Sequence, residues 1–137
     1  MTGYARKALL MMYSIKVALA EDHDAYRAEL VKLLRSHDFL LTCDTKNGLF
    51  TRTLHPFLLP DIAIINYKTR RPETLNAARW LREAYPKVRI VISTLFPFHL
   101  PENEFKALGI DGVIIKSQQN ADSIIEMLQR VYKGEGG

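Results

Sequence analysis

The sequence predicts an α/β fold in which helices cover both faces of a doubly wound parallel sheet. Two observations support this prediction: short apolar runs rich in β-branched residues recur along the chain, and segments with helical periodicity separate them. Strands that alternate with helices favour right-handed crossovers and parallel pairing. The chain has 137 residues, of which 47% are hydrophobic and 25% charged, and this is enough for one compact domain with its own core.

Five apolar runs are predicted to be strands. Four of them are nearly continuous, as expected of parallel strands that are buried on both faces. The run over residues 39–43 is weaker and fits an edge strand. In chain order the runs are residues 15–20, 39–43, 62–65, 88–92 and 112–115.

The first predicted helix is opened by Asp24, which is a capping residue type. Its apolar side chains repeat at helical spacing and would pack on the sheet; they are Tyr26, Leu30, Leu33 and Leu34. The segment over residues 47–55 is the weakest predicted helix, since Gly48 and several threonines lower its propensity. The next helix begins near Pro72 and ends before Pro86. Its apolar stripe consists of Leu75, Ala78, Leu81 and Tyr85.

The last two predicted helices have recognisable ends. Residues 101–108 form a short helix that ends at Gly109, which suits a left-handed C-cap. Asn120 can cap the final helix. The buried face of that helix is expected to consist of Ile124, Ile125, Leu128, Val131 and Tyr132.

The composition argues against several classes of function. Cys43 is the one cysteine, so no internal disulfide can form, and we expect a buried, inert thiol in a reducing, cytoplasmic compartment. The four histidines, His23, His37, His55 and His99, lack the spacing of a zinc site. The net charge of +4 is spread along the chain, so direct nucleic-acid binding is not expected.

The chain is predicted to consist of an N-terminal extension over residues 1–14, one domain over residues 15–134, and the start of a linker or tail over residues 135–137. The apolar run over residues 8–13 follows Arg6 and Lys7, but it is too short to cross a membrane and lacks a signal-peptide cleavage site. Residues 1–13 are therefore expected to be dispensable for folding.

Polar side chains follow four of the five predicted strands. Glu21 and Asp22 follow the first strand, Asn66 the third, Thr94 the fourth and Lys116 the fifth. Each of these alone could equally be a solvated turn or surface residue. Ligands in a doubly wound sheet bind at the carboxyl ends of the strands, so we expect these five side chains to line one crevice.

Three segments give this pattern a specific resemblance. They are Ala20-Glu21-Asp22-His23, residues 60–66, which end in Asn66, and residues 107–116, which end in Lys116. In this order and spacing they resemble the signatures of a response-regulator receiver domain, over about residues 15–134. The resemblance implies a flavodoxin-like, five-stranded parallel sheet of order 2-1-3-4-5 with five helices.

The resemblance also implies roles for these residues. Glu21 and Asp22 would help to hold a magnesium ion, and an aspartate at position 66 would accept a phosphoryl group from a histidine kinase. Thr94 and Lys116 would contact the phosphoryl oxygens, with Ser93 as the alternative hydroxyl. Clustered carboxylates suit a hard divalent ion, which neutralises the charge that develops during phosphoryl transfer.

The chain departs from this pattern at the acceptor. Asn66 has a neutral amide, which is a poor nucleophile, so phosphorylation there should be lost and magnesium binding by Glu21 and Asp22 should be weak. No other cofactor is expected. The family usually continues with a proline and a glycine in the loop after the acceptor, whereas this chain reads Tyr67-Lys68-Thr69-Arg70-Arg71-Pro72-Glu73-Thr74. Val113 stands where a switching aromatic is common. Three departures in one mechanism favour natural degeneration over a single engineered Asp-to-Asn change.

The leading hypothesis is a non-enzymatic signalling module that contacts a protein partner, such as a histidine kinase, an effector domain or a second copy. Lys68, Arg70 and Arg71 would attract an acidic segment or an anion, or would form a solvated loop.

An alternative is the receiver of a transcription regulator that is truncated or inactivated, because residues 131–135 resemble the end of LuxR-type receivers; no helix-turn-helix pattern follows before Gly137. A flavodoxin-like cofactor binder would need a phosphate loop where the chain has acids.

Without an acceptor carboxylate, Lys116 still needs a counter-charge. The nearest candidates by strand order are Asp22 and Glu21, and the sequence favours Asp22. Such a pair would hold the crevice in one fixed state without a metal.

Overall fold

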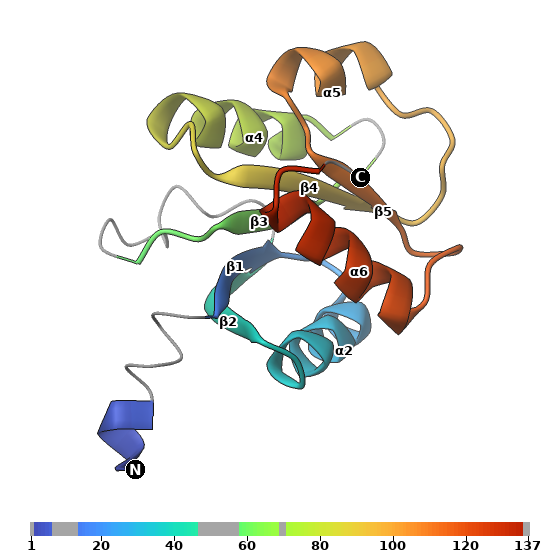
Figure 1. The fold of residues 1–137 in the computed structure, drawn as a ribbon. Coiled ribbons are helices and arrows are strands. Elements are labelled where there is room, and N and C mark those ends of the chain that lie inside the picture. The colour runs from blue at the N-terminus through green and yellow to red at the C-terminus, as the bar shows by residue number, and fades with distance from the viewer. Residues whose placement is uncertain (1, 7–13, 47–57, 69–70, 136–137) are drawn as a thin grey trace.

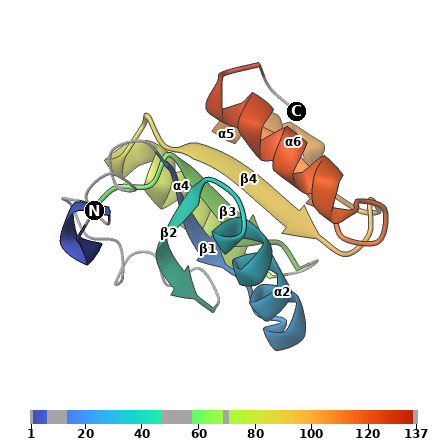
Figure 2. The same cartoon turned by 60° about the horizontal axis from the view of Figure 1, so that its bottom comes forward.

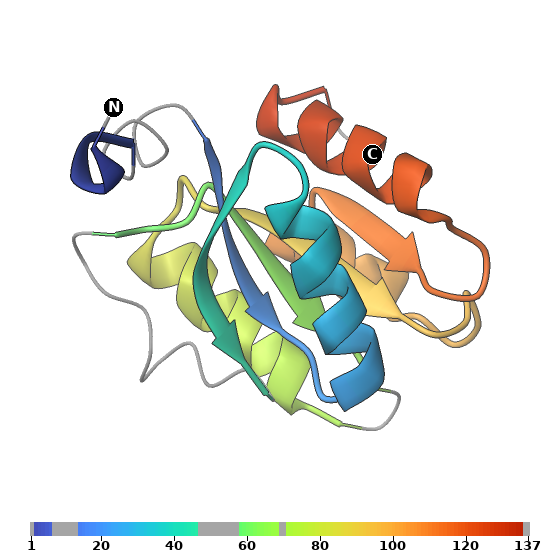
Figure 3. The same cartoon turned by 90° about the horizontal axis from the view of Figure 1, so that it is seen from below.

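The computed structural model describes residues 2–6, 14–46, 58–68 and 71–135. It contains a five-stranded parallel sheet with the strand order β2-β1-β3-β4-β5, which confirms the predicted doubly wound topology and the edge position of β2. The arrowheads of the strands point the same way in Figure 3. The strands are β1 (Ile15–Ala20), β2 (Phe39–Thr45), β3 (Ile62–Asn66), β4 (Arg89–Thr94) and β5 (Gly112–Ile115).

Helices cover both faces of the sheet. Figure 1 shows α4 (Glu73–Ala84) and α5 (Glu102–Leu108) on one side, and α2 (Asp24–Arg35) and α6 (Ala121–Tyr132) on the other. The predicted helix over residues 47–55 lies outside the described residues. Within the described ranges, no helix has the length and apolar character required to cross a bilayer.

Alternation along the strands produces two separate cores. Val17 and Leu19 of β1 pack with α2 and α6, whereas Ala18 and Ala20 face α4 and α5. Side chains in a strand alternate between the faces of the sheet, so both sets are buried only when helices cover both faces. Figure 2 shows the same three layers after rotation.

The caps predicted for the last two helices are confirmed. Gly109 takes the left-handed conformation at φ 65° and ψ 41°, where a side chain would be strained. At α6, the Asn120 side chain accepts a hydrogen bond from the Ser123 N–H at 2.9 Å, and the Ser123 hydroxyl accepts one from the Asn120 N–H at 3.0 Å. This reciprocal capping box satisfies two backbone donors that the helix itself leaves free.

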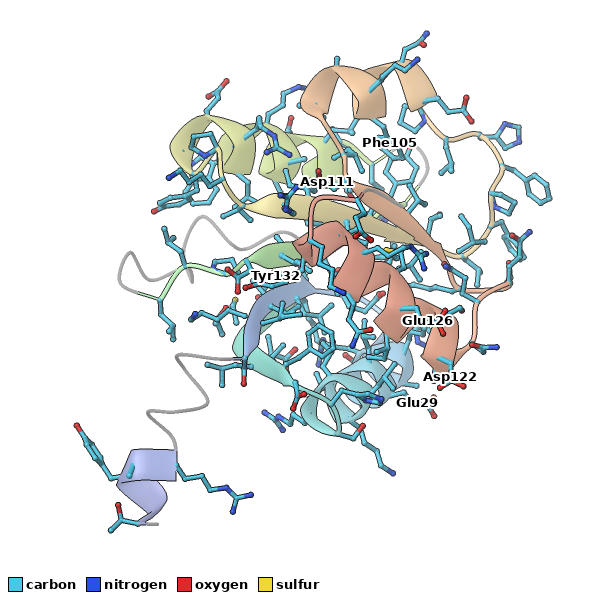
Figure 4. All side chains as sticks on the ribbon, in the orientation of Figure 1. Glu29, Phe105, Asp111, Asp122, Glu126 and Tyr132 are labelled. Carbon is cyan, nitrogen blue, oxygen red and sulfur yellow. The ribbon has the colours of Figure 1, made fainter. Side chains whose placement is uncertain are left out.

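Three sequence predictions are wrong in detail. The N-cap of α2 is His23, not Asp24, because His23 is extended and its Nδ1 accepts the Tyr26 N–H at 3.1 Å. Strand β4 begins at Arg89, one residue after the buried Val88. Tyr132, labelled in Figure 4, is 46% exposed rather than part of the buried face. It is the last residue of α6 and lines an open hollow.

Candidate functional site

The carboxyl ends of the strands border a crevice of about 730 Å³. Asn66 lies beside Ser93 in the sheet, and Thr94 lies beside Ile115, so the ends of β3, β4 and β5 meet at one edge. Four of the predicted site residues line the crevice, and Glu21 lies buried beneath it. The four are Asp22, Asn66, Thr94 and Lys116.

Lys116 is the central cation of this crevice. Its side chain is only 10% exposed, and its ammonium contacts Glu21 Oε1 at 2.5 Å and Asn66 Oδ1 at 3.0 Å. The ring of Tyr26 lies beneath it, with 4.4 Å between Nζ and the ring centroid. A charged carboxylate, an amide oxygen and an aromatic face thus replace the water that a buried ammonium loses.

Glu21 is completely buried, and both of its carboxylate oxygens are bonded. Oε2 accepts the His23 N–H at 3.0 Å, and Oε1 accepts the Ser93 hydroxyl at 3.4 Å in addition to Lys116. The partner of Lys116 is therefore Glu21, and the preference for Asp22 is wrong. The reason is that the Glu21 N–H still bonds to Thr45 O at 3.0 Å, which extends the strand pairing and keeps this residue at the interior level of the sheet.

Asp22 lies one residue further along the turn, at the rim. Its carboxylate pairs with Lys68 at 3.1 Å, and the Lys68 side chain is 51% exposed. Of the predicted basic cluster, Arg71 is exposed and Arg70 lies outside the described residues. Each acid after β1 is therefore matched by a lysine, one buried and one at the surface.

Asn66 is fixed from two sides. The Thr74 hydroxyl donates to its backbone carbonyl at 2.6 Å, and its side-chain Oδ1 accepts from Lys116. Among the described residues no acceptor is bonded to its amide nitrogen, Nδ2. Thr94 lines the crevice, with its hydroxyl 3.4 Å from Phe96 O, whereas Ser93 is fully buried under Glu21.

Val113 is half-buried and packs in the core beneath α4 and α5. The buried aromatic residues of that core are Tyr67, directly after Asn66, and Phe105 of α5. Figure 4 labels Phe105. Their rings meet edge to face, with centroids 5.7 Å apart. Tyr67 is nearly buried, so this aromatic contact is part of the packing and not of the open crevice.

The arrangement does not fit a divalent metal ion. Among the described residues, no three acidic, histidine or cysteine side chains are grouped as metal ligands. The ammonium of Lys116 lies against the oxygens of Glu21 and Asn66, and Asp22 is paired with Lys68. The magnesium site expected at Glu21 and Asp22 would therefore require both lysines to give up these contacts.

The burial of Tyr26 at the floor of the crevice can be tested with a Tyr26 variant. Burial, with a smaller effect of the Glu21 charge, raises the pKa of Tyr26 to about 12, and its buried hydroxyl has no hydrogen-bond partner among the described residues. We expect Tyr26→Phe to be neutral or to stabilise the fold by up to about 1 kcal/mol at pH 7, since an unsatisfied hydroxyl is removed.

The same variant should show a pH dependence. The pKa of Tyr26 is about 12 in the folded protein and near 10 in the unfolded chain, so ionisation of Tyr26 favours the unfolded chain. The contribution of neutral Tyr26 to the free energy of unfolding is therefore fully present below about pH 10 and is lost as the pH rises through about 12. The advantage of Tyr26→Phe should therefore grow by about 2–3 kcal/mol between those pH values. Urea unfolding of both proteins at several pH values measures the difference, and parallel pH profiles would contradict it.

Sequence reasoning missed several residues of the crevice. The sequence predicts Tyr26 only as part of a sheet-packing helix, and the loop after β4 contains no predicted site residue. In that loop Leu95, Phe96 and Phe98 are all more than half exposed and line the crevice. Two phenylalanines around a proline directly after a strand were the available signal, because exposed aromatics at a strand end are unusual.

No protein-family profile matches the chain. The transcriptional regulatory protein DegU of Brevibacillus brevis is 22% identical over 121 residues, which cover 88% of this chain and 51% of DegU. The chain thus spans about half the length of this curated relative.

Several solved structures are similar. A LuxR-family DNA-binding response regulator from Staphylococcus aureus has a TM-score of 0.75 at 21% identity, over 86% of this chain and 98% of that one. The isolated REC domain of RcsB from Salmonella enterica serovar Typhimurium, with the phosphomimetic BeF3-, has a TM-score of 0.75 at 16% identity, over 90% and 92%. The signal receiver domain of the putative response regulator NarL from Mycobacterium tuberculosis has a TM-score of 0.74 at 18% identity, over 88% and 98%. These likenesses show that the chain has the flavodoxin-like fold of receiver domains.

Proposed function

We propose that this chain is a receiver-like domain of two-component signal transduction that works without aspartyl phosphorylation and acts through protein contacts. Its fold, the likeness to DegU and the order of the strand-end residues support the receiver assignment. The proposed role is non-enzymatic. Its partner would be a histidine kinase, an effector domain or a second copy of the chain.

One observation carries the proposal: Lys116 is bound at once to Glu21 and to the amide of Asn66. The buried charges of Glu21 and Lys116 cancel, and the neutral amide adds none. An amide is also a poor nucleophile, so no acyl phosphate can form at this position. The crevice is therefore held in one charge-balanced arrangement by groups of the chain itself.

The proposed output is transcriptional control. DegU and the LuxR-family protein are described as a transcriptional regulatory and a DNA-binding protein, and the matched region is about half of DegU. In this proposal a separate DNA-binding domain would read the DNA, and this domain would govern it by contact. The last helices, α5 and α6, and the final strand, β5, would provide that contact.

Incubation with a small phosphodonor and magnesium should leave the mass of the protein unchanged. Asn66 offers no carboxylate, and the nearby acids are engaged by Lys116 and Lys68. The matched variant is Asn66→Asp, which differs by one group and returns a carboxylate to the same place. Intact-mass spectrometry of both proteins is the measurement. A hydroxylamine-sensitive phosphoryl adduct on the unmodified sequence would refute the proposal.

Asn66→Asp should also raise the affinity for magnesium, because a third carboxylate joins Glu21 and Asp22. Full conformational switching should not return, since Val113 cannot act as an aromatic switch residue. Calorimetric titration with magnesium and spectra before and after the phosphodonor test both statements. Tight magnesium binding by the Asn66 protein would contradict the charge-balanced crevice.

A further inference from the structure

We propose that the crevice binds a small planar aromatic molecule that carries a carbonyl or carboxylate acceptor. The inference rests on the proposed function, because it gives the same crevice an input that needs no phosphoryl group. Two features of the structure carry it: an exposed aromatic flank on one side, and a charge-balanced polar floor with an unused donor.

The flank is formed by the loop after β4. Leu95, Phe96 and Phe98 are 54%, 51% and 64% exposed. The rings of Phe96 and Phe98 are stacked, with 6.0 Å between their centroids and an interplanar angle of 24°, so a further planar ring could extend this stack. The next residue, His99, turns the loop with a left-handed φ of 58°, which is uncommon for a residue other than glycine. A contiguous apolar patch of this kind usually marks a binding surface.

The floor favours an acceptor over a cation. Glu21 and Asp22 are each paired with a lysine, so a cationic ligand would have to displace Lys116 or Lys68 from its carboxylate. Asn66 Oδ1 is occupied by Lys116, whereas its Nδ2 has no acceptor among the described residues. A carbonyl or carboxylate oxygen is the group that this amide nitrogen can bind without disturbing the floor.

The size of the crevice agrees with a small molecule. Its volume of about 730 Å³ lies within the range of roughly 300–1,000 Å³ that is typical of such pockets. Those pockets combine apolar and aromatic walls with a few polar groups that fix the orientation of the ligand. Here the ring of the ligand would extend the stack of Phe96 and Phe98, and Asn66 would orient the acceptor.

The probe for this site is 2-naphthoate, titrated into the full chain and followed by calorimetry and by saturation-transfer NMR. We expect a Kd of roughly 1 mM or tighter, the affinity that a ligand of this size commonly reaches. Cyclohexanecarboxylate keeps the acceptor and lacks the aromatic ring, and 2-naphthylmethylamine keeps the ring and carries a cation. Each should bind at least about tenfold more weakly.

Variants then locate the site. Phe98→Ala should weaken 2-naphthoate about tenfold, and its side chain is exposed enough that the core stays intact. Asn66→Asp should weaken it by a similar factor, because the donor is replaced by a like charge. Tyr132→Ala removes an exposed aromatic that lines a different hollow, and it should leave the affinity unchanged.

No binding of 2-naphthoate up to its solubility limit would overturn the inference. So would an affinity that Phe98→Ala leaves intact, or one that Tyr132→Ala weakens equally. These outcomes are separate from the phosphodonor test: a phosphoryl adduct on the Asn66 protein refutes the proposed function whatever the titration shows, and a failed titration leaves an unphosphorylated receiver standing.

Discussion

Replacement of Lys116 by methionine should lower the free energy of unfolding by about 3–5 kcal/mol. The variant leaves the fully buried Glu21 without its cation, and a buried carboxylate that has lost its partner is one of the costliest defects in a protein core. Methionine keeps most of the volume of the lysine stem, so the loss reports the charge and not a cavity. Urea unfolding at neutral pH, followed by circular dichroism, measures it.

The matched control is Lys68→Met, which breaks the rim pair with Asp22. That pair is half exposed on the lysine side, so its removal should cost less than about 1 kcal/mol. The double variant Glu21→Gln with Lys116→Met should recover part of the loss, since no unpaired charge stays buried. Equal losses for the two single lysine variants would show that Lys116 does not hold the crevice as described.

Arg82→Lys should lower the free energy of unfolding by about 2–3 kcal/mol, because charge-assisted hydrogen bonds are lost. The Arg82 guanidinium donates to four backbone carbonyls at 2.9–3.1 Å and lies 3.6 Å from Asp111. It thereby joins α4 to the end of α5 and to the segment before β4. The four carbonyls are those of Pro86, Val88, Leu108 and Gly109.

Arg79→Lys is the control for this change on the same helix. Arg79 contacts Glu104 at 3.8 Å, and both side chains are about half exposed. Its replacement should change the stability by no more than about 0.5 kcal/mol. If Arg82→Lys and Arg79→Lys unfold at the same urea concentration, the carbonyl bonds of Arg82 contribute nothing measurable.

Much of this fold could be predicted from the sequence because its strands are buried on both faces. Such strands appear in the sequence as nearly continuous apolar runs. The polar residues that follow them lie together, because the carboxyl ends of parallel strands share one edge of the sheet. The same reasoning placed Asp22, Asn66, Thr94 and Lys116 around one crevice. Gly109 and Asn120 were predictable because their caps depend on local geometry alone.

The pairing inside the crevice was not predictable for a physical reason. Glu21 and Asp22 are neighbours with the same charge, and they differ in depth only because strand pairing continues through the Glu21 N–H. That hydrogen bond depends on Thr45 of another strand, which local sequence does not encode. The N-cap of α2 differs from the prediction for a local reason, because the Nδ1 of His23, one residue before Asp24, accepts the Tyr26 N–H.

The loop after β4 was missed because hydrophobicity predicts burial, and Phe96 and Phe98 are exposed. A pattern of apolar residues cannot distinguish a side chain that is buried in the core from one that is exposed at a binding surface. Only their position beside Asn66 and Lys116 connects them with the crevice.

The cation of this crevice is the ammonium of Lys116, which is covalently part of the chain, unlike a bound metal ion. A tethered ammonium cannot be removed by a chelator, diluted away or replaced by another ion, and an amide gives a phosphatase nothing to cleave. Under the proposed function, kinase activity would leave the shape of the domain unaltered. The strength of the signal would then follow the number of copies present and the occupancy of the crevice by its ligand, so synthesis, proteolysis and ligand supply would take the place of phosphorylation.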